Sequence, residues 1–215
     1  GRLHHDQDAG LSGLDENAWT NLRAHIREQA ESTATVPSDS TVVLERFRDE
    51  LGDWMLVVHC PLGAAVLTPW ALAIEAAARE RFGDEVRAWA SNDGIVISVP
   101  DLDEAPGAEL LPTDAESVRE WVTDEVFGSA LFAARFRESA ARALLLPRRD
   151  PGRRTPLWRQ RQRAAQLLQV ASRHRDFPII LETMRECLED VFDLASLTEL
   201  LDGLASRRIH LVVSD

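Results

Sequence analysis

The chain has 215 residues, of which 45% are hydrophobic and 28% charged, and a formal net charge of −12. It is long enough for a hydrophobic core in one or two domains, and it shows neither a bilayer-length apolar run nor a secretory leader, so we expect a cytoplasmic protein with no membrane segment. All 24 basic residues are arginine, which fits a GC-rich genome and excludes a Walker A lysine and Schiff-base catalysis in this chain.

The first hundred residues predict an α+β unit. Apolar spacing predicts a helix over 14–31, and Pro69, at a first helical position, predicts a second helix over 70–82 that ends at Gly83. Runs rich in β-branched and apolar residues predict four strands, at 41–47, 54–59, 86–90 and 95–99.

The remainder of the chain predicts mainly helices. Residues 101–112 mix acids, prolines and a glycine without periodicity, which predicts a linker or a long surface loop. Beyond this segment we expect helices at 114–127, 129–146, 156–174, 178–192 and 194–206, and a short strand at 209–213. The predicted fold class is α+β: a mixed β-sheet with flanking helices, followed by a mainly helical C-terminal half, with subdomains at 1–100 and 113–215.

Charge is unevenly distributed along the chain. Residues 1–130 hold 25 acids and 9 arginines, whereas residues 131–175 hold 12 arginines and only two acids, Glu138 and Asp150. Such a basic stretch in an acidic chain suits either a polyphosphate or an acidic protein surface, and the sequence leaves both open.

The strongest candidate for phosphate contacts is the proline-stiffened loop between the predicted helices 129–146 and 156–174. Because this loop is not helical, no packed helix face can bury its four arginines. They are Arg148, Arg149, Arg153 and Arg154. The alternative is that this loop docks onto an acidic neighbouring domain.

The helix after this loop carries further candidates. Arg159 and Arg163 lie opposite its apolar stripe, and we expect them to be solvated. Arg161 falls inside the stripe, where we expect a carboxylate such as Glu138 or Glu182 to pair with it, because an unpaired buried charge is costly. Trp158 borders the stripe, and we expect it to cap the core, with stacking on a nucleic-acid base as the alternative.

We predict no catalytic centre and no metal site. The cluster His4, His5, Asp6 and Asp8 lies in a terminal segment, and adjacent histidines point in different directions. His59 and Cys60 are neighbours in or beside a strand and point to opposite faces, so Cys60 is expected to be a buried thiol. Cys187 is expected to pack in the core.

Three stretches carry a family resemblance: 42–83 (VVLERFRDELGDWMLVVHC…), 91–101 (SNDGIVISVPD) and 129–193 (SALFAARFRESAARALLLPRRDPGRRTPLWRQRQ…). Together they resemble the DEAD/H-associated region of large helicase-related, Lhr-type superfamily 2 helicases. The chain departs from that pattern at Met184, at Cys60 and over residues 1–12.

The resemblance implies an accessory domain of an ATP-dependent helicase that unwinds DNA or RNA:DNA duplexes, with a role in DNA repair and a place at the nucleoid. ATP and Mg²⁺ would bind to RecA-like motor domains of the same polypeptide, outside this chain. The implied partners are single-stranded DNA or RNA and those motor domains. On this interpretation the loop arginines, Trp158, Arg159 and Arg163 contact nucleic acid; the alternative is a purely structural docking domain.

Overall fold

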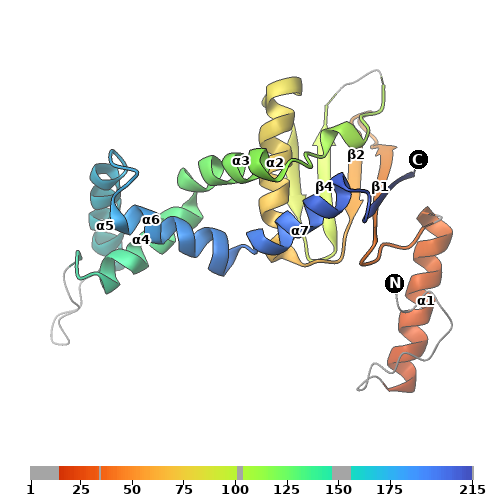
Figure 1. Ribbon diagram of the computed structural model, residues 1–215, viewed down its shortest axis with the longest axis horizontal. Coiled ribbons are helices and arrows are strands. Elements are labelled where there is room, and N and C mark those ends of the chain that lie inside the picture. The colour runs from red at the N-terminus through yellow and green to blue at the C-terminus, as the bar shows by residue number, and fades with distance from the viewer. Residues whose placement is uncertain (1–14, 34, 101–103, 147–155, 215) are drawn as a thin grey trace.

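A mixed five-stranded sheet lies at one end of the molecule, and a group of three helices lies at the other (Figure 1). This computed structural model describes residues 15–33, 35–100, 104–146 and 156–214. The strand order is β3-β4-β2-β1-β5, with antiparallel pairs except for the parallel pair β1–β5. The strands are β1 (Thr41–Arg48), β2 (Trp54–His59), β3 (Arg87–Ala90), β4 (Gly94–Val99) and β5 (His210–Ser214).

Seven α-helices are described, together with a 3₁₀ turn, η1 (Ala108–Leu110), and a π-helical segment, η2 (Glu186–Val191). The helices are α1 (Glu16–Thr33), α2 (Ala64–Phe82), α3 (Ala115–Phe127), α4 (Ala130–Arg142), α5 (Leu157–Ala171), α6 (Pro178–Arg185) and α7 (Leu194–Ala205). Four of them begin at side-chain caps, because Asp15, Asp114, Ser129 and Asp193 each accept a hydrogen bond from a first-turn backbone N–H. The predicted α+β class is confirmed, and the predicted short last strand is β5, which lies beside β1.

The core lies on one face of the sheet. Cross-strand neighbours Leu44, Val58 and Ile95 share this face and are fully buried. They belong to a single hydrophobic cluster with buried residues of α2, α3 and α7, and Trp70 of α2 is among its largest members. At the turn into β4, a Cβ on Gly94 would overlap the carbonyl oxygen of Val58, so this position requires glycine.

Helix α2 begins earlier than predicted. It starts at Ala64, and Pro69 lies inside it rather than at its first position. Proline has no N–H, so the carbonyl of Ala65 loses its helical partner. That carbonyl instead accepts a hydrogen bond of 2.9 Å from the backbone N–H of Asp193, at the start of α7. The proline therefore helps to join two helices distant in sequence.

The segment predicted as a linker or surface loop is packed against α2 in its described part. Leu110 and Leu111 are buried, and the indole Nε1 of Trp70 donates a 3.1 Å hydrogen bond to the carbonyl of Pro112. The hydrophobic cluster includes residues on both sides of this segment. The subdomain boundaries at 100 and 113 stay a prediction.

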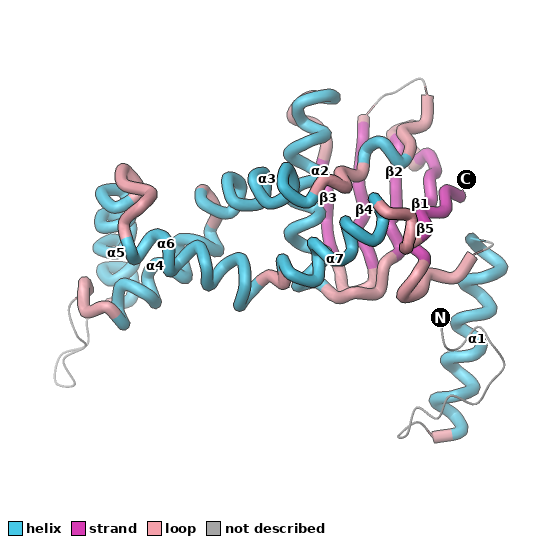
Figure 2. The backbone as a smooth tube through the Cα atoms, in the orientation of Figure 1, coloured by secondary structure: helices cyan, strands magenta, loops and turns pink. Residues whose placement is uncertain are grey.

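The predicted helix 178–192 is wrong in its last two turns. α6 ends at Arg185, and the chain continues as the wider π-helical turns of η2, where the N–H of Phe192 bonds the carbonyl of Cys187. In η2, Glu186 is buried and pairs with Arg142 of α4. Figure 2 shows how these helical segments connect the far end of the molecule to the sheet. None of the described helices combines the length and apolarity needed to cross a bilayer.

Candidate nucleic-acid interface

Helix α5 lies at the end of the molecule away from the sheet, and it packs on α4 (Figure 1). Its contact stripe is thin. Ala164 and Ala171 are buried, and Leu167 and Leu168 are partly buried against the core. The predicted apolar stripe is confirmed at Ala164, Leu168 and Ala171. Because α4 covers a narrow part of α5, most of the circumference of α5 faces solvent.

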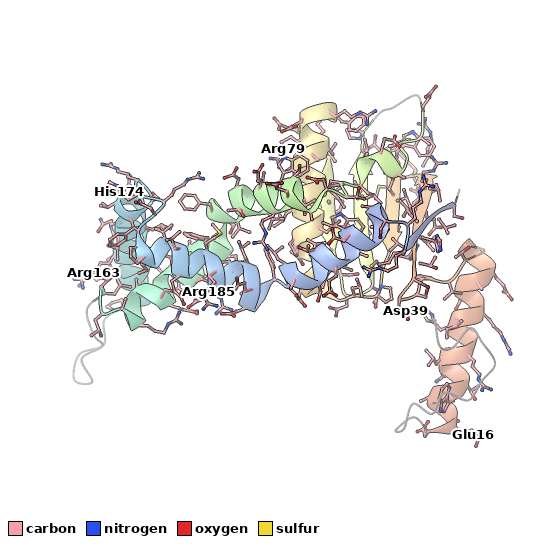
Figure 3. All side chains as sticks on the ribbon, viewed as in Figure 1. Glu16, Asp39, Arg79, Arg163, His174 and Arg185 are labelled. Carbon is pink, nitrogen blue, oxygen red and sulfur yellow. The ribbon has the colours of Figure 1, made fainter. Side chains whose placement is uncertain are left out.

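The arginines of α5 are all exposed. Arg159 and Arg163 lie in solvent as predicted, and Figure 3 labels Arg163 at the tip of this end. Arg161 is also exposed, so the prediction that it is buried and paired is wrong. The stripe that packs on α4 is too narrow to include it. Helix α5 contains no acidic residue, so its three guanidinium groups have no neutralising carboxylate on their own helix.

The carboxylates proposed as partners of Arg161 pair with other arginines. Glu138 accepts a 3.0 Å hydrogen bond from Arg135, as expected of a local ion pair on α4. Glu182 accepts from Arg185 at 2.9 Å, and this pairing holds the pKa of Glu182 below its usual range. Within the described part of the chain, no carboxylate forms an ion pair with Arg159, Arg161 or Arg163.

Trp158 does not cap the core. Its side chain is 59% exposed, so the expectation of a core position is wrong, and the alternative, stacking on a nucleic-acid base, stays a prediction. The guanidinium carbon of Arg159 lies 5.1 Å from the centre of the Trp158 ring. An exposed indole beside a cation combines a stacking surface with a phosphate-binding charge.

The basic surface continues past the C-terminal end of α5. Arg173 and His174 are exposed. Arg175, by contrast, pairs with Asp124 of α3 at 3.1 Å and lies 4.6 Å from the centre of the Phe127 ring, so it ties the turn after α5 to α3. Arg173 therefore adds charge to the exposed surface, whereas Arg175 serves packing.

The four loop arginines, Arg148, Arg149, Arg153 and Arg154, lie outside the described residues. Two arginines of the exposed surface, Arg161 and Arg173, were not among the predicted nucleic-acid contacts. The alternation of Arg159, Arg161 and Arg163 could have predicted the exposure of Arg161. Arginines at every second position of a helix are spread over an arc too wide for one neighbouring helix to cover.

The candidate reactive side chains in the described residues are Cys60, Cys187 and His59. Cys60 and Cys187 are buried, and burial raises the pKa of each thiol from 9.0 to about 11, which disfavours the nucleophilic thiolate. His59 contacts Glu45 at 2.9 Å on the sheet. No group of three or more His, Cys, Asp or Glu side chains among the described residues is placed to hold a metal ion, and His4, His5, Asp6 and Asp8 lie outside them.

Residues 36–215 match the family model described as DEAD/H associated. The chain belongs to the DEAD/H-associated family. It is 55% identical over 207 residues to the Lhr helicase of Mycolicibacterium smegmatis and 48% identical over 198 residues to the Lhr helicase/uracil glycosylase of Escherichia coli. These alignments include 96% and 92% of this chain, but 14% and 13% of the relatives.

The fold is also similar to part of a solved helicase structure. The structure of the Mycobacterium smegmatis helicase Lhr bound to ssDNA and AMP-PNP superposes with a TM-score of 0.81 at 55% identity. The match covers 94% of this chain and 26% of that chain. An archaeal relative, the ATP-dependent helicase Lhr-Core of Saccharolobus solfataricus, is 30% identical over 206 residues, which cover 93% of this chain and 23% of the relative. The chain thus spans between about a seventh and a quarter of the proteins it resembles.

Proposed function

We propose that this chain is an accessory domain of an ATP-dependent helicase, and that it contacts single-stranded nucleic acid while bracing the motor domains of the same polypeptide. The observation that carries the proposal is the solvent-facing side of α5, where Trp158, Arg159, Arg161 and Arg163 project from a helix without acids. The similarity to a helicase solved with ssDNA supports the same assignment.

The chemistry of α5 suits a sugar-phosphate backbone. Arginine presents planar, permanently charged donors that match phosphate oxygens, and each phosphate neutralised releases condensed counterions. The exposed indole of Trp158 offers a face on which any base can stack. Contacts of these two kinds carry no sequence preference, which suits a domain that holds a strand as the motor moves along it.

ATP and Mg²⁺ belong to the motor rather than to this chain. The chain has no lysine for a phosphate loop, and its described residues do not cluster into a metal site. In this proposal the domain acts through binding and positioning. Contact with RNA, a role of the parent helicase in DNA repair and a place at the nucleoid are parts of the same proposal. Sensitivity to DNA damage of a strain that lacks the parent gene tests the repair role.

The direct test is a fluorescence-polarisation titration of the 215-residue chain with a labelled single-stranded oligonucleotide. We expect binding at low salt that weakens by about tenfold or more in R159Q/R161Q/R163Q, because three phosphate contacts are lost. The matched control is R119Q/R207Q/R208Q, which removes the same charge from exposed arginines on α3 and near β5. Equal oligonucleotide affinities of the two variants would show that α5 is not part of the binding surface.

A further inference from the structure

The sheet has a second apolar face, opposite the core. Cross-strand pairing places Val57 beside Val96 and Val96 beside Trp89, in one row across β2, β4 and β3. In the adjacent row Phe47 of β1 pairs with Met55 of β2. We define these five residues as the outer face: Phe47, Met55, Val57, Trp89 and Val96.

The outer face is accessible to solvent. Phe47 is 44% exposed and Trp89 is 54% exposed, while Met55, Val57 and Val96 are partly exposed. None of the five belongs to the hydrophobic core cluster. Among the described elements, α2 is the helix that packs extensively on the strands, and its buried residues join the core on the other face.

An antiparallel face that meets water normally presents polar side chains. Here valines, a methionine and two aromatic residues are contiguous instead. Exposed apolar patches of this kind mark interaction sites, and Trp, Phe and Met are enriched in the cores of protein–protein interfaces. The outer face therefore has the composition of a protein-binding surface.

Its charge surroundings point away from nucleic acid. Glu45 stands beside Val57 in one row, and Arg87 ends the adjacent row of Phe47 and Met55, so the two charges on this face balance. The surrounding chain is acidic, because residues 1–130 hold 25 acids against 9 arginines. This part of the chain repels a phosphate backbone, whereas the arginines of α5 lie at the opposite end of the molecule (Figure 1).

We propose that the outer face docks against another domain of the parent polypeptide, which presents an apolar patch to it. The argument for this occupant is the length of chain outside the domain: this chain corresponds to 26% of the solved Lhr chain and 14% of the mycobacterial relative. The inference rests on the proposed function, in that it assumes a longer parent helicase. The inference names the surface that would brace the motor. It leaves α5 free to contact the nucleic-acid strand.

Hydroxyl-radical footprinting of the purified parent polypeptide, without nucleic acid, tests the proposal. Oxidation of each tryptophan is measured by mass spectrometry and normalised to the urea-unfolded parent. Docking predicts that Trp89 is protected about as well as the fully buried Trp70, because interface cores pack like protein interiors. Oxidation of Trp89 at the rate that its 54% exposure allows would overturn the proposal.

Two variants of the parent sharpen the result. V57E should expose Met55 and Trp89 to oxidation, and L181E, which changes a 56% exposed residue of α6 at the far end, should not. If V57E also exposes Trp70 to oxidation, the sheet has unfolded. In that case W89E, on the edge strand β3, replaces V57E as the test variant, and oxidation of Met55 is measured. Equal Met55 oxidation in W89E and in the unmodified parent contradicts docking.

Other occupants give distinguishable outcomes. Protection of Trp89 that depends on protein concentration would indicate a second copy of the chain, and protection that requires added oligonucleotide would indicate nucleic acid; both results overturn the proposal. The oligonucleotide affinity of the 215-residue chain should be the same with and without V57E. Footprinting therefore tests the docking proposal, and oligonucleotide affinity tests the proposed function. Either proposal can fail while the other holds.

Discussion

The two ends of the molecule use the same residue types for opposite purposes. At the sheet end Trp70 is fully buried with its indole N–H bonded, and Arg79 of α2 pairs with Glu125 of α3 at 2.9 Å. At the helical end Trp158 and Arg163 face solvent, and Figure 3 labels Arg79 and Arg163 in these contrasting places. Residue type alone therefore does not assign a side chain to folding or to binding. What decides is how wide a face of its helix the neighbouring element covers.

The largest effect is expected from removing the sheet-end tryptophan. W70A deletes a fully buried side chain and its hydrogen bond to Pro112, and we expect a loss of about 3–5 kcal/mol in the free energy of unfolding. Urea denaturation of the 215-residue chain measures it. W158A is the matched control, with an expected change within about 0.5 kcal/mol because Trp158 is exposed. Similar losses in the two variants would abolish the contrast between the ends.

The second effect concerns the buried carboxylate between α4 and η2. Glu186 is buried and accepts hydrogen bonds from Arg142 and Ser139. R142A leaves this carboxylate without its cation, and we expect a loss of about 1–3 kcal/mol. R135A removes the exposed pair with Glu138 and should cost about 0.5 kcal/mol or less. If chemical denaturation shows that R142A lowers the free energy of unfolding no more than R135A does, the buried pair does not hold η2 against α4.

A third prediction addresses binding by the exposed tryptophan. W158A should weaken oligonucleotide binding by about 1–3 kcal/mol, because a stacking face is lost, whereas W158F should retain part of it. Fluorescence polarisation under low-salt conditions measures both. An unchanged affinity in W158A would restrict the helical end to electrostatic contacts.

The last prediction concerns the pH dependence of stability at alkaline pH. The chain has no lysine and no tyrosine, so the side chains expected to titrate between pH 9 and 11 are the two cysteines. Burial raises the pKa of both thiols from 9.0 to about 11, so the neutral form is favoured in the folded state. Their contribution to stability is complete below pH 9 and is lost as the pH rises through 11.

The urea midpoint should therefore fall between pH 8.5 and 11 in the wild-type chain, and it should fall less in C60A/C187A. A variant with the same pH dependence as the wild type would show that the thiols do not cause it.

The strands were predictable from sequence because their β-branched runs are short and bounded by turn residues. β2 has the predicted bounds, and β1, β4 and β5 differ from the predicted strands by a residue at one or both ends. The start of α2 was not predictable from local rules, because the cost of Pro69 is offset by a hydrogen bond from Asp193, far along the chain. Likewise, the exposure of Arg161 and Trp158 depends on how much of α5 is covered by its neighbour α4. The periodicity of a single helix does not contain this information.

We propose that the α5 arginines hold a nucleic-acid backbone, a claim that the salt dependence of oligonucleotide binding can decide. For single strands the slope of log affinity against log salt changes by about 0.7 for each phosphate contact. We predict that R159Q/R161Q/R163Q lowers the magnitude of the slope by about 2, and that R119Q/R207Q/R208Q leaves it at the wild-type value. The claim is contradicted if both variants keep the wild-type slope, or if the control variant shows the larger decrease.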